Sequence, residues 1–287
     1  MSADIRNILV PTDFSEPAMK AIHFAANLAV AFRCKLTLYH AIGIPYLTSP
    51  EELEMSTTID LERIESEQLY HLRNQLALEF KDITIEAQTS TGFTVEEIRS
   101  LARDGRIDLV VMGTRGASSF RELLMGSNTS SLVQQTECPV LAIPENTLFQ
   151  GINKIVFACN LIKDDVQSLI RLIEMFKNVN PEITLLHVHD GHTVHAEKEM
   201  ENWMQNTVRP TVKYNKLNAI TVIDTDIVKS LHNYLSENPT DLLVTATRKR
   251  NFFEKIFDPS ISRKLIFHTH IPLLVLHKHG SKGEMIF

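Results

Sequence analysis

The chain has 287 residues, a formal net charge of −6 and a sequence pI near 6.1. An acidic chain lacks the positive field that gathers phosphates along a duplex, so general nucleic-acid binding is excluded. No apolar run approaches the roughly eighteen residues needed to cross a bilayer, and the opening MSADIRNILVPTD does not resemble a signal peptide. We therefore expect a cytoplasmic protein with no membrane contact and, from its length and 44% hydrophobic content, two packed domains.

The first half alternates short β-branched runs with longer helical patterns, which is typical of βαβ units and a parallel sheet. The predicted strands are 7–13, 35–41, 82–89, 108–114 and 139–144. The predicted helices, in which apolar residues recur every three or four positions, are 16–32, 50–80, 94–105 and 129–137.

The same order then begins again in the second half. The predicted strands are 154–160, 182–190, 219–224, 241–247 and 271–277, and the helical patterns are 168–178, 193–214 and 226–239. A shift of 147 positions lays Lys154 on Asn7 and His187 on His40, and a shift of 133 lays Pro272 on Pro139. We infer a tandem duplication with domains 1–146 and 147–287.

The three cysteines of the chain suggest no metal or disulfide framework. Cys34, Cys138 and Cys159 are odd in number and show no CxxC spacing. We predict that all three are small core hydrophobes.

Glycines cluster after the fourth predicted strand, in VVMGTRGASSFRELLMGSNTSS, residues 110–131. In a doubly wound sheet, ligands bind at the carboxyl ends of strands where the strand order reverses. Gly113 and Gly116 follow such a strand, and glycine lets a ligand touch the main chain. Gly126 and Ser127 precede a predicted helix, whose N-terminal amides attract anions. The spacing predicts two glycine loops around one polyphosphate; the alternative is a set of turns with Ser127 as a helix cap.

Neither the P-loop pattern GxxxxGK[ST] nor GxGxxG occurs in the chain, so other nucleotide folds must be considered. The spacing G-x2-G-x9-G-[ST] resembles the ATP-binding motif of the universal stress protein family. The segments ILVPTDFSEPA, LYHA, GFTVEEI, DLVVMGTRG and CPVLAIP resemble the same family. The resemblance implies two tandem Rossmann-like domains of the adenine nucleotide alpha hydrolase-like type, each an α/β fold with a five-stranded parallel sheet of order 3-2-1-4-5.

The resemblance also implies a set of site residues in the first half and no catalytic residue. Asp13 would accept hydrogen bonds from the ribose, or else serve the start of the first helix with Ser15 as its cap. The other implied contacts are Pro11 and Thr12 at the nucleoside floor, Ala41 at the adenine edge, Met112, Gly113, Arg115 and Gly116 at the sugar and phosphates, and Gly126, Ser127, Asn128 and Thr129 around the phosphates. ATP, ADP or AMP would bind, with Mg²⁺ between the phosphates.

The second half has changed the three glycine positions and the Asp13 position, which are the diagnostic ones. Asn160 stands where the first half has Asp13, and Ala246, Lys249 and Pro259 stand where it has glycines. Side chains block a close main-chain approach, and proline removes an N–H donor. We expect the second half to keep the fold without the nucleotide.

Histidines cluster in HVHDGHTVH of the second half, namely His187, His189, His192 and His195. Imidazole is a common zinc ligand, but the spacing fits no closed tetrahedral pattern, so we assign no metal site. His40 and His187 occupy equivalent strand ends, which favours a structural role shared by both halves.

The sequence leaves three function hypotheses. The first is a stress-response, ATP-binding regulatory module with little turnover, because no general base, Walker lysine or second acidic cluster is present. The second is a slow ATPase or phosphotransferase, and the third is a scaffold that binds a partner protein. The apolar strands 139–144 and 271–277 would invite aggregation as bare edges. In the family that the chain resembles, the last strand pairs two protomers, so the resemblance implies that the two halves pair here as an intramolecular pseudo-dimer; a homodimer of whole chains is left open.

Overall fold

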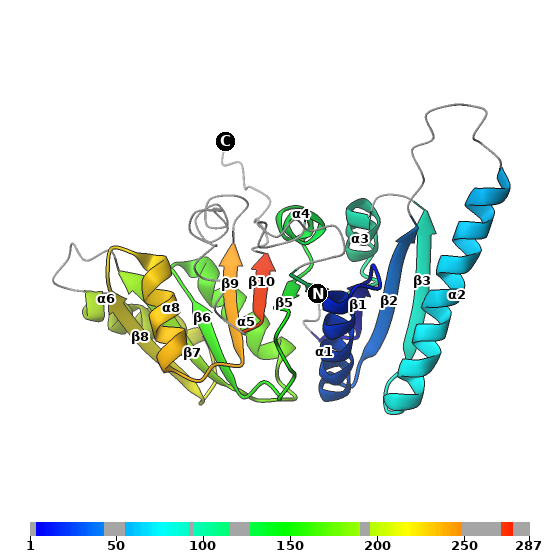
Figure 1. Ribbon diagram of the computed structural model, residues 1–287. Helices are drawn as coiled ribbons and strands as arrows, with labels where there is room; N and C mark the ends of the chain where they lie inside the picture. Colours follow the sequence, from blue (N-terminus) through cyan, green and yellow to red (C-terminus); the bar gives the residue numbers. More distant parts are fainter. Residues whose placement is uncertain are drawn as a thin grey trace, which may run out of the picture.

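The computed structural model places the strands of both halves in one sheet (Figure 1) and describes residues 4–42, 55–91, 94–114, 127–189, 196–247 and 271–277. The first half contributes strands β1 (Asn7–Pro11), β2 (Lys35–Ile42), β3 (Ile85–Thr91), β4 (Leu109–Gly113) and β5 (Val140–Ile143). Its helices are α1 (Glu16–Phe32), α2 (Met55–Glu79), α3 (Thr94–Arg103) and α4 (Ser127–Gln135).

The second half repeats this order. Its strands are β6 (Lys154–Ala158), β7 (Glu182–His189), β8 (Leu217–Ile223), β9 (Leu242–Thr247) and β10 (Leu273–His277). Its helices are α5 (Lys163–Met175), α6 (Ala196–Trp203), the π-helical segment η2 (Met204–Val208), α7 (Arg209–Thr211) and α8 (Ile227–Glu237).

The strand order is β3-β2-β1-β4-β5-β10-β9-β6-β7-β8. Each half therefore has the order 3-2-1-4-5 in its own numbering, which confirms the α/β fold with parallel strands. The two halves join where β5 and β10 pair antiparallel, with Leu273 opposite Ala142 and Val275 opposite Val140. This pairing covers the two apolar strands that would otherwise be open edges.

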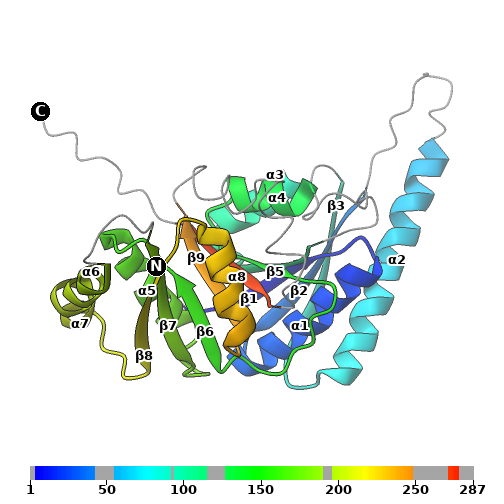
Figure 2. The ribbon, with the colours of Figure 1, turned by 60° about the vertical axis from the view of Figure 1, so that its left-hand side comes forward.

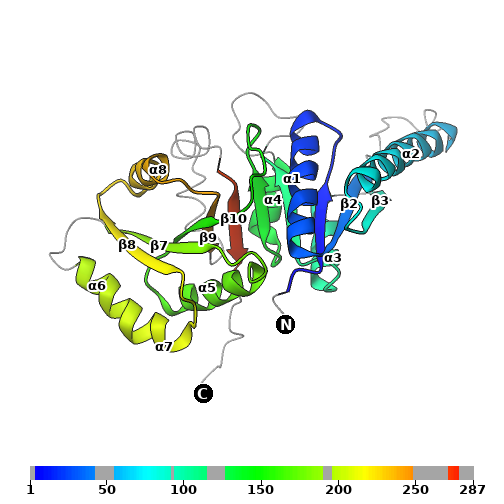
Figure 3. The same cartoon turned by 90° about the horizontal axis from the view of Figure 1, so that it is seen from below.

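Helices cover both faces of the sheet (Figures 2 and 3). In the first half, Ile8 and Val10 of β1 share a core with α1 and α2, whereas Leu9 faces α3 and α4. In the second half, α5 and α6 extend the first of these cores, and α8 packs on the other face. The rings of Phe32 and Phe176 meet edge to face at 5.1 Å, so α1 and α5 pack together across the two halves.

Several element boundaries differ from the predicted ones, and three of these differences stand out. β3 begins at Ile85 and not at residue 82, because a turn occupies residues 81–83. α5 begins at Lys163, five residues early, because the Asp165 carboxylate accepts the N–H of Ile162 and caps the helix. The stretch 193–214 was predicted as one helix, and residues 196–211 are instead divided between α6, η2 and α7.

The duplication extends to backbone geometry. Phe14 and Leu161, which are 147 positions apart, have φ values of 60° and 59°, and Arg33 and Asn180 have 56° and 53°. In each half, one such residue lies between the first strand and the helix that follows it, and another lies between that helix and the second strand. Both are non-glycine residues in the left-handed region.

Equivalent aspartates bind the start of the first strand in each half. Asp108 Oδ2 accepts the N–H groups of Arg6 and Asn7, at 2.9 and 3.0 Å. Asp241 Oδ2 accepts those of Asn153 and Lys154, at 2.7 and 2.8 Å. Each carboxylate satisfies two amides that precede or begin the first strand of its half.

The cysteines are buried, as predicted. Burial raises the pKa of Cys34 and of Cys138 to about 12, so both stay protonated at neutral pH. These thiols fill the core and are poor nucleophiles.

Candidate functional site

The carboxyl ends of β1 and β4 form the point where the strand order of the first half reverses. β1 lies between β2 and β4; α1 leads to β2 on one side, and α3 enters β4 on the other. The pairs Ile8 with Leu109 and Leu9 with Val110 set the two strands side by side. Pro11 and Gly113 therefore end neighbouring strands, at the place where this class of sheet binds ligands.

The chain turns sharply after β1 through a network of short hydrogen bonds. Thr12 is buried, and its Oγ1 accepts the N–H of Phe14 at 3.0 Å. Asp13 Oδ1 accepts both the N–H and the hydroxyl of Ser15, and Ser15 Oγ in turn accepts the N–H of Ala18 at 3.4 Å. The structure shows the alternative weighed for this segment: Ser15 caps α1, and Pro17 lies in the first turn. Asp13 supports this cap, and its side chain is exposed at the strand end.

His40 ties the turn after β1 to β2 and α2. Its Nδ1 lies 2.7 Å from the carbonyl oxygen of Thr12, and its Nε2 lies 3.2 Å from Glu65 Oε2 of α2. The imidazole also stacks against Phe14, with ring centroids 4.6 Å apart. Since a carbonyl only accepts, Nδ1 carries a proton. His40 thus holds the segment that presents Asp13.

The second half keeps this histidine contact. His187 Nδ1 lies 2.9 Å from the carbonyl oxygen of Cys159, the counterpart of Thr12. The shared geometry supports the structural role that we expected for both histidines.

The start of α4 is fixed against the end of β4. The hydroxyl of Thr129 donates to the carbonyl oxygen of Gly113 at 3.1 Å, and Thr129 is 3% exposed. The first amides of a helix have no partner within it, and the helix dipole makes this end positive. The bond brings the N-terminus of α4, which begins at Ser127, to the edge where β1 and β4 end.

The structure gathers most of the predicted site residues at these strand ends. Pro11, Thr12 and Asp13 end β1; Met112 and Gly113 end β4; Ala41 lies on β2, two residues beyond the partner of Pro11; and Ser127, Asn128 and Thr129 form the first turn of α4. Arg115, Gly116 and Gly126 lie outside the described residues.

Sequence reasoning missed three residues that shape this edge. Phe14 adopts a positive φ, Glu65 approaches from α2, and Thr114 is buried and donates its N–H to Ile143. The recurrence of the β1–α1 connection in the second half, where Leu161 has the same positive φ, is the one signal that could have found Phe14.

The second half carries a carboxylate where the first half has none. Asp165 is 1% exposed, and its Oδ2 accepts the N–H groups of Asn160 at 2.7 Å and of Ile162 at 3.3 Å. The first-half counterpart of Asp165 is Ala18. In the second half, the side-chain carboxyl of Asp165 therefore accepts the loop amides that follow β6.

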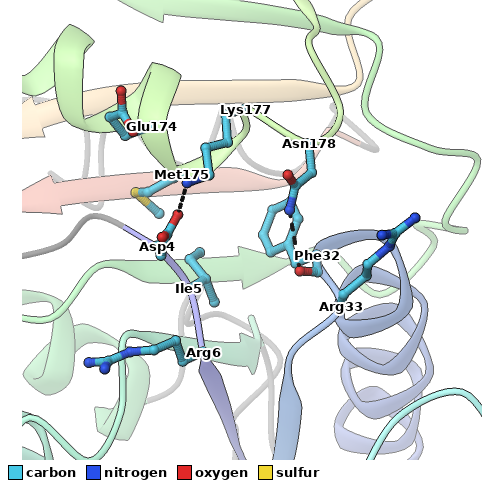
Figure 4. Close-up of a pocket in the computed structure, with 9 residues that line it drawn as sticks. All are labelled: Asp4, Ile5, Arg6, Phe32, Arg33, Glu174, Met175, Lys177 and Asn178. Carbon is cyan, nitrogen blue, oxygen red and sulfur yellow. Dashed lines mark hydrogen bonds and ion pairs between the residues drawn. The ribbon is translucent and has the colours of Figure 1, made fainter.

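Two cavities of about 290 and 300 Å³ lie where the two halves meet, and neither is lined by a predicted site residue. The first, shown in Figure 4, opens between Asp4 to Arg6, the end of α1 and the end of α5. Lys177 pairs with Asp4 across it, and Asn178 Nδ2 donates to the carbonyl oxygen of Phe32. Arg6 and Arg33 point away from each other in Figure 4, so these cations do not converge on one anion. We regard this cavity as part of the contact between the halves.

Among the described residues, no cluster of three or more histidine, cysteine or acidic side chains could hold a metal. His187 and His189 lie on β7 with ring centroids 6.1 Å apart, and His189 Nε2 is 3.7 Å from Glu199. Asp190, His192 and His195 of the histidine-rich stretch lie outside the part of the chain that the structure describes.

The family model for the universal stress protein family matches the chain twice, over residues 4–144 and 151–277. The chain belongs to the universal stress protein family. The two matches lie on either side of the connection between β5 and β6 and together span nearly the whole chain, so this is a tandem member.

Individual universal stress proteins are similar to this chain. The universal stress protein MJ0531 of Methanocaldococcus jannaschii is 26% identical over 139 residues, which are 48% of this chain and 81% of that protein. A universal stress protein from Archaeoglobus fulgidus has a solved structure that covers 95% of this chain and 96% of its own, with a TM-score of 0.72 and 17% identity. Another solved member is a complex with cAMP; it covers 49% of this chain and 97% of its own, with a TM-score of 0.37 and 23% identity. The fold of the whole chain is therefore shared with a universal stress protein.

No described helix combines the length and the apolar character that a membrane span requires.

Proposed function

We propose that this chain is a regulatory module of the stress response that binds one adenine nucleotide, ATP or one of its shorter forms, in the first half. The observation that carries the proposal is the spacing of Gly113, Gly116, Gly126 and Ser127. It begins at the end of β4 and finishes at the start of α4, at the switch point of the sheet. Only the first half has it.

The described geometry supports an anion at this edge. The Thr129 bond to Gly113 sets the N-terminus of α4 beside the end of β4, where free amides and the helix dipole favour phosphate. Asp13 is an exposed carboxylate on the neighbouring strand end, suited to accept hydrogen bonds from ribose hydroxyls. Ser127, Asn128 and Thr129 offer oxygen ligands of the kind that Mg²⁺ prefers, and the cation would neutralise phosphate charge.

We expect Asp13→Ala to weaken nucleotide binding by about 1.5–3 kcal/mol, the usual value of hydrogen bonds to a charged group. The matched variant Asn160→Ala, at the same place in the second half, should leave the affinity unchanged. Titration calorimetry of ATP into both proteins measures this and should give a stoichiometry near one for the native chain. A stoichiometry of two, or equal losses in the two variants, would contradict the assignment.

We expect little or no hydrolysis of the bound nucleotide. Asp13, the exposed carboxylate after β1, already accepts two hydrogen bonds from Ser15, which makes it a poor base for activating water. Steady-state phosphate release should stay below about 1 s⁻¹, the lower end for dedicated phosphoryl-transfer enzymes. Faster, Asp13-dependent release would instead support the ATPase hypothesis.

The two halves would act as one cytoplasmic unit. We place the domain boundary between residues 146 and 147, in the connection between β5 and β6. The antiparallel pairing of β5 with β10 supports an intramolecular pseudo-dimer in which the second half stabilises the first without binding nucleotide.

A further inference from the structure

β8 is the last strand at one end of the sheet (Figure 3). Two of its isoleucines are exposed, and because side chains alternate along a strand, they lie on opposite faces of the sheet. Ile220 is 36% exposed and Ile223 is 56% exposed. At the other end of the sheet, the exposed residues of β3 are polar, namely Glu86 and Thr91. Proteins protect sheet edges because unpaired strands bind other strands. Of the two edges, β8 is the one suited to association.

In the part of the chain that the structure describes, no strand pairs with the outer side of β8, and alternate residues of β8 direct their backbone N–H and C=O groups to that side. The N–H of Ile183 in β7 donates to the carbonyl of Lys216, and the N–H of Asp224 donates to the carbonyl of His189, each at 2.9 Å. Since successive residues of a strand direct their polar groups to opposite sides, the even-numbered residues from Lys216 to Asp224 bond to β7. The odd-numbered residues from Leu217 to Ile223 then direct theirs outward.

We propose that a second copy of this chain pairs antiparallel along β8, about a two-fold axis that passes through Ile220. In this register, Leu217 lies opposite Ile223, so outward-directed backbone groups meet as hydrogen-bonded pairs. Ile220 meets its own copy on the axis. The interface is isologous, as closed dimers require.

Charge selects this register among its neighbours. With the axis at Ile220, Lys216 of one copy lies opposite Asp224 of the other, at both ends of the paired strands. Moving the axis to residue 219 sets Lys216 opposite Val222, and moving it to residue 221 sets Asp224 opposite Asn218. The Lys216 ammonium donates to the carbonyl of Asn180 at 2.8 Å and has two further hydrogens for a carboxylate.

A cysteine scan along β8 tests the axis directly. In the native chain with Ile220→Cys, the two new thiols occupy a non-hydrogen-bonded pair, whose Cα atoms are about 4.5 Å apart, within the range for a disulfide. We expect rapid formation of a covalent dimer under a mild copper-phenanthroline oxidant, seen on a non-reducing gel. The native cysteines are buried and give little background.

Ile223→Cys is the matched control. Its thiol is more exposed, but its own copy lies six residues away along the strand, about 20 Å, so it should not cross-link. Equal cross-linking of both variants would indicate random collision and overturn the proposal, as would the absence of a covalent dimer in Ile220→Cys.

The second measurement is the oligomeric state of the unmodified chain, from light scattering across a concentration series. We expect a dimer whose dissociation constant rises at least about tenfold in Ile220→Lys, because two like charges meet on the axis. Thr91→Lys, on the opposite edge of the sheet, should leave the dimer unchanged. A native chain that is monomeric at every concentration, or a dimer that resists Ile220→Lys with its melting transition intact, would contradict β8 pairing.

Discussion

We expect Gly126→Asp to make the free energy of nucleotide binding less favourable by several kcal/mol. A carboxylate at this position would stand beside the phosphates, and its side chain would block the close approach of the ligand to the main chain. Charge repulsion and steric exclusion act together here, so the loss should exceed that of Asp13→Ala. Calorimetric titration with ATP measures the loss.

Pro259→Ala, at the corresponding place in the second half, is the control and should leave affinity unchanged. Gly126→Asp should keep the native melting transition, because the glycine spacing predicts a loop there and loops tolerate substitution better than the core. Unaltered binding in Gly126→Asp would move the nucleotide away from the glycine-rich stretch. Loss of the melting transition would instead mean that Gly126 serves the fold.

Phe157→Ala is expected to lower the free energy of unfolding by about 3–5 kcal/mol, as for other large aromatic residues truncated in a core. Phe157 lies on β6 in the centre of the second half, is 0% exposed and belongs to the core that α5 extends between the two halves. Urea unfolding followed by circular dichroism measures the change. Leu148→Ala, at a site 77% exposed, should change it by less than about 0.5 kcal/mol.

This variant also tests whether the two halves share one core. If they do, nucleotide binding in the first half and the second half's secondary structure should be lost in one transition. A first half that keeps its affinity after the second half has unfolded would show that the halves are energetically independent.

The sequence by itself determined the class and order of the elements. β-branched runs alternating with amphipathic helices can bury their apolar faces only as a covered parallel sheet, so the succession of strands followed from the periodicity alone. The repeat was recognised because the same succession of strands and helices begins again at residue 154. The buried cysteines were predicted from their isolated spacing, and the cap of α1 by Ser15 was one of the two alternatives that the sequence offered for the segment after Asp13.

Local ends of elements depended on contacts that no periodicity encodes. α5 begins early because a side chain, Asp165, folds back on the amides that precede the helix. Residues 196–211 contain a π-helical segment, which the periodicity did not predict, and its Met204 and Val208 are buried in the core that includes α5.

The candidate site shows the same division. Its residue types could be chosen from the glycine spacing and the family resemblance, because bare backbone near phosphate is a local requirement. The ties that orient it were decided by the tertiary structure, since they join residues distant in sequence. His40 reaches Thr12 and Glu65, and Thr129 reaches Gly113, only after β1, β2, β4 and α2 have packed.

How the two halves join also depended on the tertiary structure. The sequence marked 139–144 and 271–277 as apolar strands that would pair the two halves, but it did not specify the direction or the register, which the structure gives as antiparallel with Leu273 opposite Ala142. Pairing β5 with β10 inside one chain leaves β3 and β8 as the ends of the sheet. The order of the second half places β8 at one of these ends, where Ile220 and Ile223 are exposed, and among the described residues no strand lies beyond it.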